Sequence, residues 1–138
     1  MKTHITIQQL LSDANEEQRE QLKAWWKPRI GDLYYDSRFD FACVVGLIDE
    51  LGNIRGQFVP LMSVGQMIWF TGKSLRPKIF KVTKNQIRYY KEKHNPPIKL
   101  TVNWWAISCR QTHTQHLVFC QQHLVDALWQ ATLNVLKN

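Results

Sequence analysis

The spacing of apolar residues changes abruptly near residue 30. Between Ile5 and Trp26, apolar residues with the spacing of amphipathic helices occur in two groups, 5–11 and 22–26, and Pro28 ends the pattern. From Gly31 onward, the short runs DLYYD, FACVVGLID and IRGQFVPL are rich in aromatic and β-branched residues, which predicts strands. A chain that supplies helices first and then a series of short strands is typical of the α+β class.

The rest of the chain extends this pattern. Ser12 and Asp13 divide the opening helix into two pieces and offer a cap, and the turn ELGN joins the second and third strands into an antiparallel meander. Further elements are expected in the order helix 64–72, strand 77–83, basic helix 85–94, long strand 98–111, strand 117–120 and helix 123–137. We therefore expect a single α+β domain over residues 1–138, with a mainly antiparallel sheet covered by the N-terminal and C-terminal helices.

Length and cysteine content narrow the class of protein. The 138 residues suffice for a hydrophobic core, and no segment approaches the roughly 18 consecutive apolar residues of a membrane span. The N-terminus has no signal-peptide pattern, and Cys43, Cys109 and Cys120 form an odd set that fits reduced thiols. These features predict a cytoplasmic protein that does not enter membranes, and the many aromatic residues make a homodimer a further expectation.

The positive charge is concentrated in one segment. Residues 73–99 hold nine Lys/Arg against one Glu, whereas the rest of the chain is close to neutral. Cations interleaved with aromatic residues are typical of surfaces that neutralise a nucleic-acid backbone and stack bases, although a solvated face is the alternative. The residues predicted to bind nucleic acid are Lys73, Arg76, Lys78, Lys81, Lys84, Arg88, Tyr89, Lys91 and Lys93. Lys78 and Lys81 have opposite parity in a strand, which argues against one continuous groove.

Two tryptophan doublets require an explanation. At the end of the first helix, Trp25 extends the apolar stripe of Leu22, which leaves Trp26 beside Lys27 and Arg29. An exposed tryptophan next to cations predicts a partner-binding group made of these three residues, and packing of Trp26 under a lysine stem is the alternative. In the second doublet, strand alternation would send Trp104 and Trp105 to opposite faces of a covered sheet.

Two clusters contain residue types that can bind metal ions. A zinc site could draw on Cys109, His113, His116, Cys120 and His123, but their spacing matches no established finger or ribbon, so core thiols and surface histidines are favoured. A divalent-metal site could draw on Asp32, Asp36 and Asp40, but Asp36 and Ser37 suit a turn, with Arg38 to neutralise a neighbouring carboxylate.

Motifs for nucleotide binding and common hydrolytic chemistry are absent from the sequence. Cys43, flanked by apolar residues, has the character of an unreactive core thiol. We therefore predict no catalytic residue, no metal ligand and no cofactor.

Three short sequence motifs resemble those of a known group of proteins. WWKPRIGDLYY, VPLMSVGQMIWF and LVDALWQATLNVL contain the patterns W-x-P-x-x-G-D, P-L-x-S-x-G-Q-M and D-A-L-W. In these words the chain resembles small uncharacterised proteins encoded in phages and prophages of Gram-positive bacteria. The resemblance implies a phage accessory context in a bacterial host and no known activity. We interpret Gly31 with Asp32 as a turn, Gly65 with Gln66 as the start of a helix, and residues 126–129 as helix packing.

Three functions remain in competition. The favoured one is a non-enzymatic binding module that engages a polyanion, most simply nucleic acid, through residues 73–99. The second is an inhibitor that binds a host defence factor through an acidic surface of that protein, with an apolar contact patch around Trp26 or Trp69. The third is a small metal-dependent nuclease that uses the three aspartates.

Overall fold

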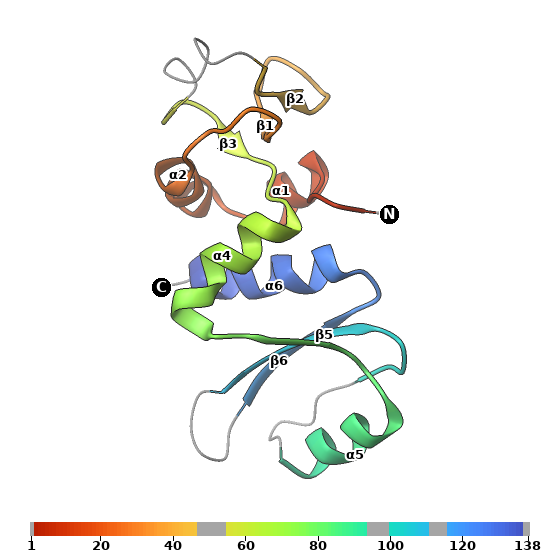
Figure 1. The fold of residues 1–138 in the computed structure, drawn as a ribbon. Helices are drawn as coiled ribbons and strands as arrows, with labels where there is room; N and C mark the ends of the chain where they lie inside the picture. The colour runs from red at the N-terminus through yellow and green to blue at the C-terminus, as the bar shows by residue number, and fades with distance from the viewer. Residues whose placement is uncertain (1, 47–54, 94–99, 111–115, 137–138) are drawn as a thin grey trace. The chain divides into compact units, whose positions relative to one another are not determined.

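The computed structural model describes residues 2–46, 55–93, 100–110 and 116–136, and these residues form helices and antiparallel strands of the α+β class (Figure 1). The chain divides into unit 1, residues 1–63 with 136–138, and unit 2, residues 64–135. The α+β class is confirmed, but the strands form two three-stranded sheets rather than one. The single domain expected from the sequence stays a prediction.

Unit 1 opens with two capped helices. α1 spans Ile7–Asp13 and α2 spans Glu16–Trp25. Asn15 accepts a hydrogen bond from the backbone N–H of Gln18, whose side chain accepts one from the backbone N–H of Asn15. This reciprocal pair satisfies two N–H groups at the helix start, so Asn15, and not Ser12 or Asp13, is the cap of α2.

The strands of unit 1 are short. β1 (Leu33–Tyr35) lies between β2 (Cys43–Val44) and β3 (Val59–Pro60), and both pairings are antiparallel. The expected meander is wrong, because β3 pairs with β1 and not with β2. The ELGN turn lies outside the described residues.

The W-x-P-x-x-G-D word forms a clasp between helix and sheet in unit 1. The indole Nε1–H of Trp26 and the backbone N–H of Arg29 both donate to Oδ2 of Asp32, each at 3.0 Å. Gly31 has φ +93°, a conformation that favours glycine, and its N–H donates to the carbonyl of Val45 at 2.8 Å. The residues of this motif therefore have a structural role, because they form the turn that connects α2 to β1.

Unit 2 contains the elements of the basic segment. In chain order it has α4 (Val64–Leu75), β4 (Lys78–Lys81), α5 (Lys84–Lys93), β5 (Trp105–Arg110), β6 (His116–Gln121) and α6 (Leu124–Leu136). β5 is the central strand, with β4 and β6 antiparallel on either side. α4 continues through Gly72 to Leu75, so Gly72 does not end the helix as the sequence suggested.

The sheet of unit 2 has apolar side chains on both faces. On one face, Ala106 packs with Val82 and Val118, and Ile87 of α5 packs against this cluster. On the other face of β5, Ile107 and Cys109 are buried, and α6 lies along that side in Figure 1. α6 buries Ala127, Leu128 and Trp129, so the D-A-L-W word serves packing, as interpreted from the sequence.

The long strand expected over 98–111 begins only at Trp105. Asn103 has φ +69°, and Trp104 donates its N–H to the carbonyl of Thr101 at 3.1 Å, so this part of the chain is a turn. Trp104 is therefore outside the strand, and the alternation expected of the doublet does not apply to it. Within the described residues, no helix has the length and apolar character needed to cross a membrane.

Candidate functional site

The cations of the basic segment come from three consecutive elements of unit 2. Lys73 lies in the last turn of α4, Lys78 and Lys81 lie at the two ends of β4, and Lys84 and Arg88 lie one turn apart on α5. All of these side chains, and that of Arg76 between α4 and β4, are exposed. Six of the predicted residues are thus exposed to solvent, and all six belong to unit 2.

Among the side chains that the structure describes, which do not include that of Glu92, no Asp or Glu forms an ion pair with any of these six. Unit 2 holds ten Lys/Arg against two Asp/Glu, Glu92 and Asp126, so its positive charge is compensated only slightly within the unit. A surface of this kind keeps its attraction for a polyanion.

The register of β4 sets where its lysines point. Lys78 lies opposite Ser108 and Lys81 lies opposite Trp105, so the two project from opposite faces of the sheet. The Nζ of Lys81 lies 5.5 Å from the centre of the Trp105 ring, which is a cation–π contact. The opposite parity anticipated from the sequence is confirmed, and the cations do not share one flat face.

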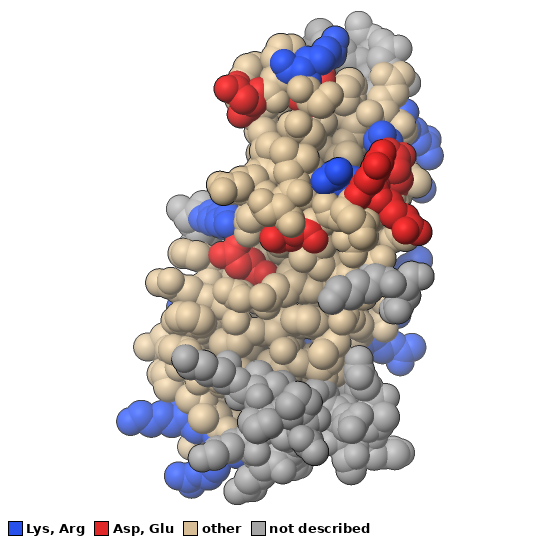
Figure 2. Space-filling model, turned by 180° about the vertical axis from the view of Figure 1, so that it is seen from behind, with Lys and Arg blue, Asp and Glu red and all other residues tan. Residues whose placement is uncertain are grey.

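Figure 2 agrees with this distribution for the face that it shows. Lysine and arginine side chains project separately at the margins of the lower part. The described cations are therefore spaced apart on this face. The side chains of Tyr89, Lys91 and Lys93 lie outside what the structure describes, so their predicted role stays a prediction.

The predicted partner-binding group in unit 1 requires a correction. Trp26 is 1% exposed and packs with Val45, Tyr34 and Phe58, and Trp25 is the half-buried member of the doublet. The expectation of an exposed Trp26 is wrong, because the residue lies beyond the last turn of α2 and its indole is drawn inward by Asp32. Lys27 and Arg29 are exposed, but the indole is not available beside them.

The exposed tryptophan is Trp69 on α4, with 61% of its surface accessible. It stands one helical turn before Lys73, at the start of the basic segment, and was not among the predicted site residues. A signal for it existed in the sequence: glycine at 65 and 72, one turn to either side, leaves little for the indole to pack against.

The three aspartates do not form a carboxylate cluster. Asp32 accepts from Trp26 and Arg29, and buried Asp36 accepts from the guanidinium of Arg38, with the closest contact at 2.6 Å. These hydrogen bonds and the charge of Arg38 hold the pKa of Asp36 below its ordinary value. The expectation that Arg38 neutralises a neighbouring carboxylate is confirmed, and two of the three carboxylates already have donors.

The thiols of the possible zinc cluster lie on opposite faces of the sheet. Cys109 is buried on the Ile107 side of β5, and Cys120 lies opposite Ala106 and packs with the cluster on the other side. Burial raises the pKa of the Cys109 thiol to about 11, which disfavours the thiolate. The described residues hold no group of three or more possible ligands close enough for a metal ion. His113 lies outside them.

The expectation that Cys43 is a core thiol is wrong, because its neighbours Phe41 and Val44 are exposed and Cys43 lies outside the buried core. It is half-buried, and burial is the main cause that raises its pKa. The thiolate is therefore disfavoured at neutral pH.

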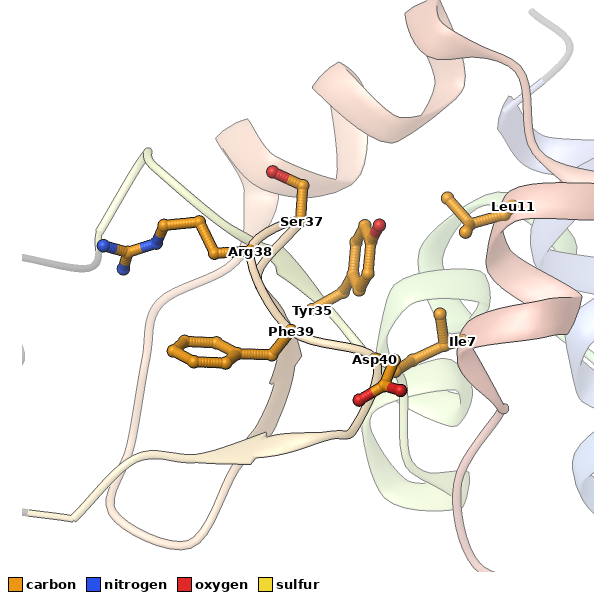
Figure 3. A pocket seen from close by; sticks show the side chains of 7 residues that line it. All are labelled: Ile7, Leu11, Tyr35, Ser37, Arg38, Phe39 and Asp40. Atoms are coloured by element: carbon orange, nitrogen blue, oxygen red, sulfur yellow. The ribbon is translucent and has the colours of Figure 1, made fainter.

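Unit 1 carries a separate pocket of about 480 Å³ between α1 and the loop after β1 (Figure 3). Ile7, Leu11 and Tyr35 supply apolar walls, and Asp40 places a carboxylate at the rim. The guanidinium of Arg38 points away from the pocket and is engaged with Asp36. The lining thus combines apolar side chains with the Asp40 carboxylate, and Arg38, whose guanidinium is held by Asp36, is the positively charged residue among the described lining residues.

Exposed aromatic rings adjoin the pocket. Phe39 and Phe41 are 43% and 58% exposed, with ring centres 5.1 Å apart, and the guanidinium of Arg38 lies 5.6 Å from the centre of the Phe39 ring. Exposed apolar groups therefore occur in both units, but only unit 2 combines them with an excess of cations.

Searches of protein-family models, curated proteins and solved structures find no match for this chain. The candidate site accordingly rests on the chain's own residues.

Proposed function

We propose that the protein binds nucleic acid through the exposed cations of unit 2 and catalyses no reaction. The observation that carries this proposal is the charge imbalance of unit 2, whose exposed Lys73, Arg76, Lys78, Lys81, Lys84 and Arg88 lack carboxylate partners among the described residues. Nucleic acid is the cytoplasmic polyanion that pairs phosphate charge with flat bases, and unit 2 offers both cations and aromatic rings. The proposal places the protein's action in the cytoplasm of a bacterial host.

The test is a charge reversal on α5 with a matched control in unit 1. Lys84→Glu with Arg88→Glu changes the net charge as much as Lys27→Glu with Arg29→Glu, and all four side chains are exposed. Binding to labelled single-stranded and duplex DNA and RNA is measured by fluorescence anisotropy at about 50 and 200 mM salt, a range over which phosphate contacts weaken strongly.

The two double variants have different expected results. The α5 variant should lose more than about tenfold in affinity at the lower salt and show a shallower salt dependence, because phosphate contacts are removed. The unit 1 variant should bind nearly as well as the unaltered protein. Equal losses of affinity in both variants would mean that binding depends on net charge alone and not on the α5 cations. If the protein binds no nucleic acid at low salt, the proposal is refuted.

A second candidate is the inhibitor of a host defence factor, which the exposed Trp69 also favours. Tryptophan beside lysine has the composition of a protein-interface hot spot, and the cations could meet an acidic surface. The salt series separates the candidates. Attachment to an acidic protein through an apolar centre should survive at 200 mM salt, whereas nucleic-acid binding should fall steeply.

A further inference from the structure

Trp69 is exposed because the rotation of α4 is fixed by other residues. Met67 and Thr71 are fully buried, and the hydroxyl of Thr71 donates to the carbonyl of Met67 at 2.7 Å, within the helix. Trp69 lies about 200° around the helix from Met67, so burial of Met67 turns the indole outward. A side chain of this size usually buries most of its surface, and 61% exposure leaves a large flat apolar group in water.

The helical neighbours of Trp69 differ on its two sides. Gly65 and Gly72 lie about 40–60° to one side of it, and Gln66 and Lys73 lie about 40–60° to the other. On the glycine side, a Cβ built at Gly72 would meet nothing within 4 Å. One side of the indole is thus open, and the other carries an ammonium group one turn away.

Two residues of this helix are poor choices for helix stability. Gly72 lies inside α4, where alanine would favour the helix by about 0.5–1 kcal/mol, and packing does not require a glycine there. Arg76 follows the last residue of α4 with φ +45°, a position and conformation that normally favour glycine. Residues that disfavour the local backbone conformation are expected at functional sites. Here Gly72 and Arg76 lie on either side of Lys73, and Gly72 is one turn from Trp69.

We propose that Trp69 is a stacking platform for an unpaired nucleobase, with Lys73 and Arg76 placed to neutralise the adjoining phosphates, so that the ligand of unit 2 is a single strand. This inference rests on the function proposed above. A duplex buries its base faces against one another, and only an unpaired base can lie flat on an exposed ring. Stacking on a ring tolerates any base sequence, so recognition is of the single strand and not of a sequence.

The spaced arrangement of the cations agrees with this ligand. Lys78 and Lys81 project from opposite faces of the sheet, and the Trp105 ring lies under Lys81. A flexible strand can follow such a path, whereas the fixed groove geometry of a duplex requires cations on one face.

The experiment compares a normal single strand with an abasic strand of the same length and charge, of about 12 nucleotides. Unaltered protein, Trp69→Ala and Trp69→Phe are titrated against both strands and against a duplex, in DNA and in RNA. Gly72→Leu is a second variant, which fills the open side of the indole without removing it. Because Trp69 is exposed, Trp69→Ala should fold normally, which circular dichroism checks.

The inference predicts a difference between the two strands. Trp69→Ala should bind the normal strand about tenfold more weakly and the abasic strand as well as the unaltered protein does. Trp69→Phe should keep most of the affinity, and Gly72→Leu should weaken binding of the normal strand alone.

The contrary outcomes separate this inference from the proposed function. If the Lys84 and Arg88 double variant loses binding while Trp69→Ala does not, unit 2 binds nucleic acid and the stacking role is wrong. Tighter binding to duplex than to single strand would overturn the inference in the same way. If the unaltered protein binds no nucleic acid, both proposals fail.

Discussion

The two units of this chain treat charge in different ways. Unit 1 holds eight Lys/Arg and nine Asp/Glu, and several of its carboxylates form local contacts: Asp32 accepts a hydrogen bond from Trp26, and Asp36 and Glu20 form ion pairs with Arg38 and Lys23. Unit 2 holds ten Lys/Arg and two Asp/Glu, and its exposed cations are left without such contacts among the described residues. A charged side chain that stabilises a turn is already engaged in the fold, whereas an exposed cation without an ion pair remains able to contact a ligand.

The same contrast holds for the tryptophans. Trp26 of unit 1 is buried and donates to Asp32, whereas Trp69 of unit 2 is exposed beside Lys73. Sequence alone makes the two look alike, because each lies within one helical turn of a lysine. The substitutions below test whether one unit uses its aromatic and charged residues for folding and the other for binding.

The largest expected effect is that of Trp26→Ala. The variant should lose about 3–5 kcal/mol of unfolding free energy, because it leaves a cavity under Val45 and removes the donor to Asp32. Trp69→Ala is the matched control and should change stability by less than about 0.5 kcal/mol. Urea unfolding of both variants measures the difference. Similar losses would mean that Trp69 supports the fold and would remove the contrast.

Asp32→Ala should have the next largest effect. Two donors, the Trp26 indole and the Arg29 backbone N–H, would lose their acceptor, at a cost of about 1–3 kcal/mol. Asp40→Ala, in the same segment and exposed, should be close to neutral. Thermal unfolding of the two variants provides the comparison. An equal response would show that the carboxylate of Asp32 is dispensable for the clasp.

Gly72→Ala should stabilise the protein by about 0.5–1 kcal/mol, since a methyl group fits the open space and alanine favours the helix. This gain in stability is opposite in sign to the losses expected for Trp26→Ala and Asp32→Ala. A glycine that lowers stability without a packing role is expected where a position serves binding. Chemical denaturation measures it. A loss of stability would mean that the glycine is required by packing.

The smallest effect concerns pH. In Arg38→Ala, the pKa of Asp36 should rise toward its ordinary value of 3.8, because the guanidinium that lowers it is gone. A lowered folded-state pKa adds stability above the ordinary pKa, and this contribution is lost as the pH falls through the folded-state value. The variant should therefore differ from the unaltered protein near neutral pH and converge with it in strong acid. An NMR titration of the Asp36 carboxyl group measures the shift. An unchanged pKa would show that Arg38 does not act on Asp36.

Much of the fold could be predicted because it depends on local patterns. The period of apolar residues located α1, α2, α6 and the strands β4 and β6, and the parity of Lys78 and Lys81 followed from strand geometry. The order of the strands in unit 1 could not be predicted, because pairing β3 with β1 instead of β2 depends on contacts between distant residues.

The charged residues of the candidate site were predicted from the sequence, whereas Trp69 was named only as one of two possible apolar contacts of an inhibitor. Charge is visible in composition, so Lys73, Arg76, Lys78, Lys81, Lys84 and Arg88 were all found in the sequence and are all exposed. The exposure of a tryptophan depends on which face of its helix is buried. Trp26 was expected outside because Trp25 continued the helical stripe, but the helix ends at Trp25 and the clasp to Asp32 sets the direction of the next side chain.

The hydrogen bonds at the junction between β4 and β5 determine which part of unit 2 can be replaced by protein engineering. The N–H of Val82 donates to the carbonyl of Trp104 at 2.8 Å, and the N–H of Asn103 donates to the carbonyl of Val82 at 2.9 Å. The chain that leaves the sheet after Val82 and carries α5 thus returns to its point of departure, and its two ends are fastened together. A helix of equal length that keeps Ile87 could therefore replace α5 while the sheet retains its register.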